Sequence, residues 1–200
     1  MGNKVELSEI KEPVNIRGER ADFENEKYGS HSRNTFDIWL AKSETPAPLV
    51  IYIHGGGFVG GDKSKYFESE DLVHFLDAGV SVATINYRFM TEAPYGILSC
   101  FNDSKSCLQF IRHNAQKYNI DKTRVACSGG SAGAGTALWL AFSDDMADPE
   151  NEDPVLREST RLTCAGAFAT QSTYDIFQWE KIVGVSMSET PEQLQAIATA

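Results

Sequence analysis

The sequence lacks the features of a membrane-spanning or nucleic-acid-binding protein. In its 200 residues no run of about 18 apolar residues occurs, so we expect no membrane-spanning helix. Acidic residues outnumber basic ones by 28 to 18, and the net charge is −10. No basic stripe therefore exists to neutralise the phosphates of nucleic acid or of an anionic membrane. The first residues, MGNKVELSEIKEP, lack the apolar core of a secretion signal.

Cysteine is scarce, and the four that occur form no CxxC pair. Cys100 and Cys107 lie seven residues apart on an expected helix, and two helical turns are too far for a disulfide. Cys127 and Cys164 lie in apolar runs, where a free thiol packs as a small hydrophobe. A zinc site would need a tighter cluster. We expect free thiols, no metal and a cytoplasmic location, with a secretion signal removed before Met1 as the alternative.

The chain has no internal repeat and no low-complexity tract, and we expect one domain over residues 1–200, with an N-terminal arm at 1–20 and a core from about residue 21. Strand-like and helix-like segments alternate, which favours an α/β fold with a mostly parallel sheet flanked by helices. Strands are expected at Ala21–Tyr28, Thr35–Ala41, Leu49–His54, Val80–Tyr87, Arg124–Ser128 and Leu162–Thr170. Helices are expected at Tyr66–Ala78, from near Pro94 onward, at Ala132–Phe142 and from Pro191.

A serine bounded by glycines follows one of these strands. The run GGSAG at 129–133 matches G-x-S-x-G, and a helix is expected directly after it. A serine on a sharp strand-to-helix turn needs neighbours without bulk two positions before and after it, because larger residues would make strand and helix collide. The turn also aims the first helical amides at the space above Ser131, where an oxyanion would be stabilised. The alternative is a glycine-rich turn with an incidental serine.

A second glycine loop, HGGGFVGG at 54–61, follows another buried strand. A loop of this HGGG type supplies backbone amides to the oxyanion hole of lipases and esterases. Glycine is needed there because the amides have to approach the substrate without a Cβ in the way. Both loops follow strands of an expected parallel sheet, so we expect them to meet at its carboxyl edge, where open α/β folds bind ligands.

The same loop also matches the dinucleotide-binding spacing G-x-G-x-x-G, through Gly55, Gly57 and Gly60. Two features of the sequence count against that alternative. The next helix starts only beyond Gly61, which is too late to receive a pyrophosphate, and the next strand ends in Asn86 without a ribose-binding acid. Such a cofactor would also leave the serine turn unexplained.

Three stretches together resemble the α/β-hydrolase esterases and lipases of the hormone-sensitive-lipase type. They are YGSHSRNTFDIWLAKSETPAPLVIYIHGGGFVGGDKS, INYRF…APYGIL and YNIDKTRVACSGGSAGAG, within about 28–175. The resemblance implies a serine hydrolase of small-molecule carboxylic esters that uses no cofactor. Many members carry an aspartate directly before the serine, whereas this chain has Gly130, a departure that related esterases share.

The resemblance also implies roles for particular residues. Ser131 would be the nucleophile that forms an acyl-enzyme, and the oxyanion hole would consist of the amides of Gly56, Gly57 and Ala132. His54 would order the glycine loop, and Phe58 would help to line a pocket for the substrate. The structural glycines near the site would be Gly55, Gly129 and Gly133.

The general base that such a serine needs is missing from the expected place. In this fold the acid and then the histidine follow the serine, but no histidine follows Ser131. The chain's histidines are His31, His54, His74 and His113. Asp175 is a candidate acid, with a role in ordering the QSTYD turn as the alternative.

Two interpretations remain open. In the first, the chain is the amino-terminal part of an esterase, cut off before its last strands and inactive by itself. In the second, it is a non-catalytic α/β-hydrolase-like module that binds a ligand or partner. A missing set of strands would expose a sheet edge and apolar helix surface, so we expect self-association.

Overall fold

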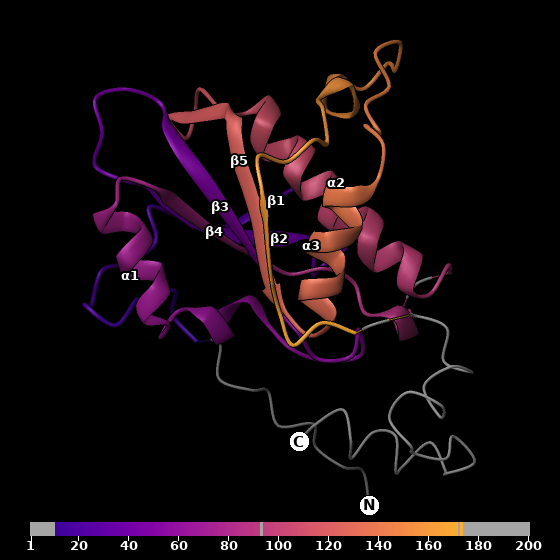
Figure 1. The fold of residues 1–200 in the computed structure, drawn as a ribbon, viewed down its shortest axis with the longest axis horizontal. Coiled ribbons are helices and arrows are strands. Elements are labelled where there is room, and N and C mark those ends of the chain that lie inside the picture. The colour runs from indigo at the N-terminus through magenta and orange to yellow at the C-terminus, as the bar shows by residue number, and fades with distance from the viewer. Residues whose placement is uncertain (1–10, 93, 172, 174–200) are drawn as a thin grey trace, which may run out of the picture.

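The computed structural model describes residues 11–92, 94–171 and 173, which form a central sheet with helices on both faces (Figure 1). In these residues the sheet has six strands in the order β1-β2-β4-β3-β5-β6. The strands are β1 (Phe23–Lys27), β2 (Thr35–Trp39), β3 (Ala47–Ile53), β4 (Ser81–Ile85), β5 (Ile120–Gly130) and β6 (Ala165–Phe168). Strands β4, β3, β5 and β6 run parallel, while β2 pairs antiparallel with β1 and β4. The α/β fold with a mostly parallel sheet is confirmed.

Three α-helices cover the sheet in the described part of the chain. Helix α1 (Glu70–Asp77) lies on one face, while α2 (Ile97–His113) and α3 (Ala132–Phe142) lie on the other (Figure 1). Short 3-10 helices connect the larger elements: η1 (Lys63–Tyr66), η2 (Met90–Glu92) and η3 (Pro154–Arg157). None of the described helices combines the length and hydropathy needed to cross a bilayer.

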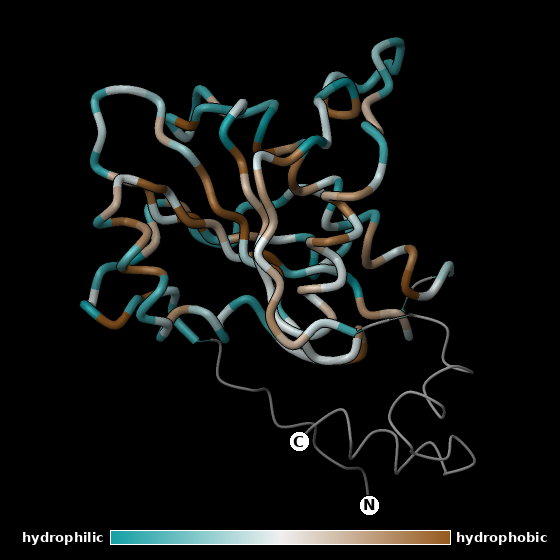
Figure 2. The backbone as a smooth tube through the Cα atoms, in the orientation of Figure 1, coloured by the Kyte–Doolittle hydropathy of each residue, from teal (hydrophilic) through white to brown (hydrophobic). Residues whose placement is uncertain are grey.

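Apolar side chains fill both faces of the sheet, as expected for parallel strands. Hydrophobic segments run along the central strands and hydrophilic ones lie in the outer loops (Figure 2). The larger core cluster lies between the sheet and helices α2 and α3, and includes Phe36, Ile51, Ile53, Leu108, Ile111 and Tyr118. The smaller cluster lies under α1, and includes Trp39, Phe67, Leu72, Val73 and Val82.

Several elements begin or end at other residues than the sequence pattern predicts. Helix α1 starts at Glu70, because the Ser69 hydroxyl caps it by accepting a hydrogen bond from the amide of Asp71. Helix α2 starts at Ile97, because Gly96 has φ 54° and cannot continue a helix. Strand β5 is longer than predicted and β6 is shorter. The helix predicted from Pro191 lies outside the described residues.

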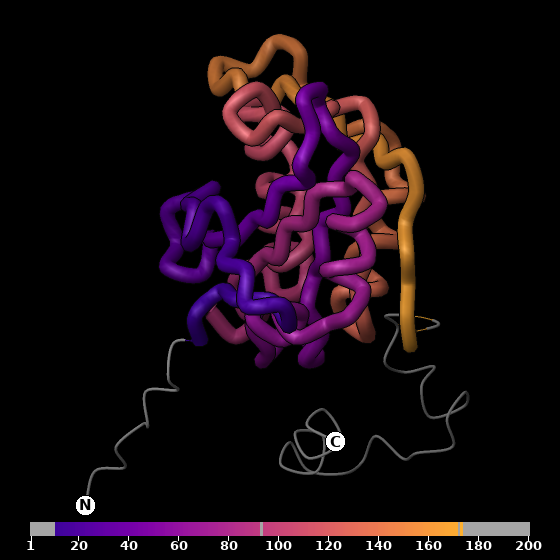
Figure 3. Tube along the Cα trace, turned by 90° about the vertical axis from the view of Figure 1, so that its left-hand side faces the viewer, coloured from indigo at the N-terminus to yellow at the C-terminus, as the bar shows by residue number. Residues whose placement is uncertain are grey.

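Cys164 is exposed, although the sequence pattern predicts that it packs among apolar residues. It lies one residue before β6 and is exposed, whereas Cys100, Cys107 and Cys127 are buried. Strand β6 is at one edge of the described sheet, and Figure 3 shows it along one side of the molecule, with the first described residues, in indigo, on the other. An edge strand is covered less than a central one, so its neighbouring residues stay in contact with solvent.

The order of the strands creates the position for a site. Strand β3 lies between β4 and β5, and the chain leaves β3 toward α1 on one face but leaves β5 toward α3 on the other. Ile53 at the end of β3 pairs with Gly129 near the end of β5. The loops that follow these neighbouring strands therefore diverge at one point of the carboxyl edge, where α/β sheets bind ligands.

Candidate active site

Ser131 makes the turn between β5 and α3 by itself. Strand β5 ends at Gly130 and helix α3 begins at Ala132. The serine has φ 52° and ψ −117°, a backbone conformation that residues with a Cβ rarely adopt. Its amide donates a 2.9 Å hydrogen bond to the carbonyl of Phe168 at the end of β6. The serine is thus held in a strained turn at the carboxyl edge, at the positive end of α3.

The glycines two positions to either side of the serine permit a close contact with β3. A Cβ on Gly129 would lie 2.5 Å from the carbonyl oxygen of Ile53. A Cβ on Gly133 would overlap the same oxygen, and would lie 2.9 Å from the carbonyl oxygen of His54. Since atoms cannot approach so closely, only glycine allows β5, α3 and β3 to meet here.

The structure brings the two glycine loops together. A Cβ on Gly55 would lie 2.8 Å from the carbonyl oxygen of Gly130 and 3.3 Å from the Cβ of Ser131. The backbone of the loop that follows β3 therefore packs directly against the serine. The two motifs, about 75 residues apart in the sequence, therefore lie side by side at the carboxyl edge of the sheet.

The amide of Gly56 belongs to a peptide whose orientation is held by His54. In a planar trans peptide the carbonyl and the next N–H point in opposite directions, so a bond to the carbonyl also orients the N–H. The Nδ1 of His54 donates to the carbonyl oxygen of Gly55 at 2.7 Å, because that oxygen can only accept. This bond orients the N–H of Gly56.

The amide of Gly57 is oriented by a turn within the loop. The carbonyl of Gly56 accepts hydrogen bonds from the amides of Val59 and Gly60, at 3.1 and 3.0 Å. Gly56 has φ 121°, and a Cβ there would overlap the carbonyl of Gly60. Glycine is therefore needed for the turn that orients the Gly57 amide.

The amide of Ala132 is oriented by the first turn of α3. The carbonyl of Ser131 accepts a hydrogen bond from the amide of Gly135 at 3.0 Å. Among the described residues no acceptor binds the amides of Gly56, Gly57 or Ala132. These three N–H groups are held in orientation; Gly56 and Gly57 are partly exposed, whereas Ala132 is fully buried.

His54 is buried and is not placed to accept a proton from Ser131. Its ring stacks on Tyr87 with centroids 4.4 Å apart and an interplanar angle of 16°. Nδ1 is bonded to the Gly55 carbonyl, and Nε2 lies 3.3 Å from an Arg33 nitrogen. Burial lowers its pKa to about 4, so the ring is neutral at pH 7. These contacts support a role in ordering the glycine loop.

The other histidines lie on different elements. His31 is in the turn between β1 and β2, where its Nδ1 accepts a hydrogen bond of 3.2 Å from the amide of Arg33. His74 is exposed on α1, and His113 is exposed at the end of α2. Among the described contacts none joins them to Ser131. Asp175, the candidate acid, lies outside the described residues.

Phe58 lies in the larger core cluster. Only 3% of its surface is exposed, and its ring packs edge-on against Phe101 at 5.6 Å and tilted against Tyr87 at 6.2 Å. Neither of the two cavities described below is lined by it. The turn of the loop directs the ring inward, and a role of Phe58 in lining a substrate pocket stays a prediction.

Gln171 is a site residue that sequence reasoning missed. Its Nε2 donates to the Ser131 Oγ at 3.3 Å, and its buried Oε1 has no partner among the described residues. It lies three residues after β6, and it lines an open cavity of about 400 Å³ with Leu138, Trp139 and Phe142 of α3. Its position after the strand next to β5 was the available signal, because parallel strands end at the same edge.

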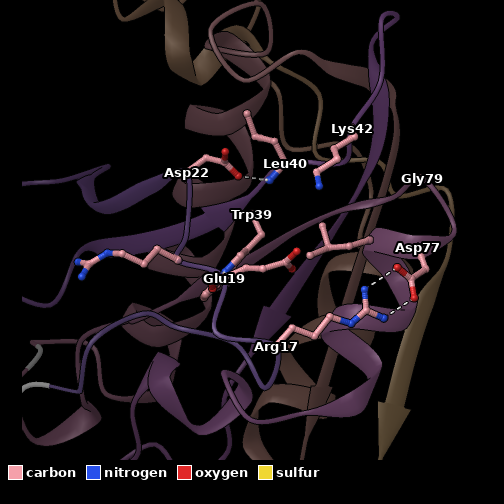
Figure 4. Close-up of a pocket in the computed structure, with 10 residues that line it drawn as sticks. Arg17, Glu19, Asp22, Trp39, Leu40, Lys42, Asp77 and Gly79 are labelled. Carbon is pink, nitrogen blue, oxygen red and sulfur yellow. Dashed lines mark hydrogen bonds and ion pairs between the residues drawn. The ribbon is translucent and has the colours of Figure 1, made fainter.

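A larger cavity lies away from the serine (Figure 4). It has a volume of about 520 Å³ and extends to Gly79, just before β4, so it is at the amino edge of the parallel strands. Figure 4 shows Arg17 directed at the Asp77 carboxylate and Asp22 bonded to the backbone of Leu40. Arg17 is paired with Asp77, and Arg20 is paired with Glu12 and Glu24 outside the lining.

The glycine loop does not lead directly into an α-helix, as the dinucleotide-binding fingerprint requires. The loop continues into η1, and α1 begins only at Glu70, ten residues after Gly60. The N-terminus of α1 is capped by Ser69. In the described segments no three His, Cys, Asp or Glu side chains gather as they would around a metal ion.

Comparison with known proteins identifies the family. The model of the BD-FAE family matches residues 36–196. The esterase LipI of Mycobacterium tuberculosis is 31% identical over 107 residues, which are 53% of this chain and 32% of LipI. Carboxylesterase NlhH of the same organism is 32% identical over 103 residues, 51% of this chain and 31% of NlhH.

Solved structures agree with this match. The acetyl ester-xyloside bifunctional hydrolase from Caldicellulosiruptor lactoaceticus superposes with a TM-score of 0.58 and 25% identity, over 66% of this chain and 48% of that protein. The chain spans about a third of the length of the two curated relatives above. The expected α/β-hydrolase fold is confirmed, and the chain belongs to the BD-FAE family of α/β-hydrolases.

Proposed function

We propose that this chain carries the nucleophile and the oxyanion-binding groups of a serine carboxylic-ester hydrolase. The observation that supports the proposal best is the contact of Gly55 with Ser131, which joins the HGGG loop to the serine turn. The relatives LipI and NlhH are named as an esterase and a carboxylesterase. A small-molecule ester is accordingly the proposed substrate.

In the proposed reaction the Oγ of Ser131 attacks the ester carbonyl carbon, and the carbonyl electron pair moves onto oxygen. The amides of Gly56, Gly57 and Ala132 bind that oxyanion, and one such donor contributes on the order of 3 kcal/mol of transition-state stabilisation. The C–O bond to the alcohol then breaks, the alcohol leaves with a proton, and an acyl-serine forms. Water releases the acid and restores the hydroxyl.

The proton of Ser131 needs an acceptor, and we propose that no histidine of this sequence provides it. His54 is buried, neutral and bonded at the Gly55 carbonyl. His74 and His113 are on helix surfaces, and the hydroxyl of Ser131 is in contact with Gln171. The 200-residue chain by itself should therefore hydrolyse esters no faster than its Ser131→Ala variant.

Exogenous imidazole can test the proposal by replacing the missing base. We would measure hydrolysis of p-nitrophenyl butyrate by the 200-residue chain, by Ser131→Ala and by Ser128→Ala, with and without imidazole. Ser128, on β5, is a matched control three residues before the nucleophile. Subtracting the Ser131→Ala rate removes direct catalysis by imidazole.

The expected result is Ser131-dependent hydrolysis only in the presence of imidazole, with Ser128→Ala behaving as wild type. Ser131-dependent hydrolysis without imidazole would show that a base is present and would overturn the assignment of the histidines. Rates that never depend on Ser131 would contradict the hydrolase proposal and favour a module that binds its ligand without turnover.

A further inference from the structure

Arg33 lies far from the two motifs in sequence but against the glycine loop in space. It belongs to the turn between β1 and β2, and only 19% of its side chain is exposed. Its guanidinium stacks on the ring of Phe89, with its central carbon 3.8 Å from the ring centroid. Such a stacked guanidinium is held in one orientation.

The guanidinium contacts both ends of the loop that follows β3. Its Nη2 lies 3.3 Å from the Nε2 of His54, at the start of the loop, and donates to the carbonyl of Gly61 at 3.0 Å, at its end. Its Nε donates to the carbonyl of Tyr87 at 2.9 Å, just after β4. One side chain thus ties the glycine loop to the neighbouring strand end.

The contact with His54 determines where the proton of the imidazole lies. Every nitrogen of a guanidinium donates and none accepts, so the Nε2 of His54 has to accept. The neutral ring then carries its proton on Nδ1, the nitrogen that donates to the Gly55 carbonyl. Arg33 thereby selects the tautomer that can make this second hydrogen bond.

The geometry points to Arg33 as a positioning residue for the oxyanion-binding amide of Gly56. Arg33 selects the Nδ1–H tautomer of His54, and this N–H donates a hydrogen bond to the Gly55 carbonyl. Because the peptide is planar and trans, fixing that carbonyl also directs the Gly56 N–H to the opposite side. A lysine at position 33 would also only donate, but its single ammonium lacks the planar fork that reaches His54, the Gly61 carbonyl and the Tyr87 carbonyl together, so it should hold His54 and the loop less firmly. The effect on catalysis rests on the proposed esterase function.

The first test needs no variant and no activity. ¹⁵N NMR of the histidine rings in the full chain at pH 7 should show His54 as a neutral ring protonated on Nδ1. In Arg33→Met only the Gly55 carbonyl still favours the proton on Nδ1, so the share of the Nε2–H tautomer should rise, and the pKa of His54 should rise because a nearby positive charge is removed. A wild-type ring protonated on Nε2, or an unchanged tautomer in Arg33→Met, would overturn the inference.

The second test is kinetic and uses the assay with imidazole. We expect kcat to fall about 10-fold in Arg33→Met and Arg33→Lys with little change in KM, because a misdirected oxyanion donor affects the transition state most. Arg20→Met, which removes an exposed arginine paired with Glu24, is the control and should keep wild-type kcat.

The two tests separate the inference from the proposed function. A wild-type chain without Ser131-dependent turnover even in the presence of imidazole would refute the proposed function, while the ring tautomer would still decide the role of Arg33. A wild-type kcat in Arg33→Met, in an active enzyme, would refute the positioning role alone.

Discussion

Gly133, in the first turn of α3, packs against the carbonyl oxygen of Ile53 at the end of β3, with no space for a Cβ between them. Gly133→Ala should therefore displace α3 from the sheet, and we expect it to lower the free energy of unfolding by about 2 kcal/mol or more. Urea denaturation followed by circular dichroism measures this change.

Gly130→Ala is the matched control for that substitution. A Cβ at position 130 would lie 3.8 Å from the Tyr52 hydroxyl and 4.0 Å from the Phe168 carbonyl, which are ordinary contacts. This variant should lose less than about 1 kcal/mol. Equal urea midpoints for the two variants would show that the close contact has no energetic importance.

The strained turn at Ser131 predicts an unusual order of stability. A residue with a Cβ at φ 52° and ψ −117° costs on the order of 1–3 kcal/mol, which glycine avoids. We expect Ser131→Gly to unfold at a higher urea concentration than Ser131→Ala, the reverse of the usual preference for alanine. If Ser131→Ala is the more stable of the two, the turn is not strained.

Burial of His54 predicts a loss of stability in mild acid. Burial lowers its pKa from 6.5 to about 4, so between these values the unfolded state binds the proton and the folded state does not. The contribution of His54 to the free energy of unfolding therefore decreases as the pH falls from about 6.5 to 4, by about 3 kcal/mol in all. Denaturation midpoints measured across this range test it.

His54→Asn is the matched control, since its amide can still donate to the Gly55 carbonyl but does not titrate. The stability of this variant should depend less on pH between 4 and 6.5 than that of the wild type. An identical pH dependence in both proteins would mean that other groups cause the acid sensitivity.

The exposed aromatic rings near β6 predict self-association. Phe142 at the end of α3 is 84% exposed, and Phe168 on the edge strand β6 is 79% exposed. We expect sedimentation velocity to show concentration-dependent association that Phe168→Lys weakens, because a charged side chain disfavours edge-to-edge pairing. Tyr95→Lys, at a residue that is 74% exposed and lies between η2 and α2 and not on a strand, should have no such effect. A wild type that stays monomeric at all concentrations would contradict the prediction.

The types and order of the elements were predictable from the sequence, but several of their ends were not. Strands β3 and β4 could be predicted because they consist of runs of apolar residues, and α2 because its apolar residues recur with the period of a helix. The starts of α1 and α2 depend on a cap at Ser69 and a positive φ at Gly96, which periodicity does not reveal. The exposure of Cys164 depends on which strand lies at the edge.

Some residues of the candidate site were likewise predictable from the sequence, and others were not. Ser131 and the glycines around it could be named because each local turn requires particular residue types at fixed spacing. Arg33 and Gln171 could not, since they contact the loops from segments 21 and 40 residues away from His54 and Ser131. Phe58 belonged to the recognised loop, but its inward orientation depends on the positive φ of 64° that the turn gives it.

By itself the sequence determined the α/β class, the nucleophile candidate and the glycines that its turn needs, because these follow from local backbone sterics and hydrophobic pattern. The tertiary structure alone decided which distant groups complete the site: the strand order that brings Gly55 against Ser131, and the side chain of Arg33 against His54. Such contacts depend on directions in three dimensions, and a hydrogen bond between residues far apart in the chain leaves no periodic signal in either segment.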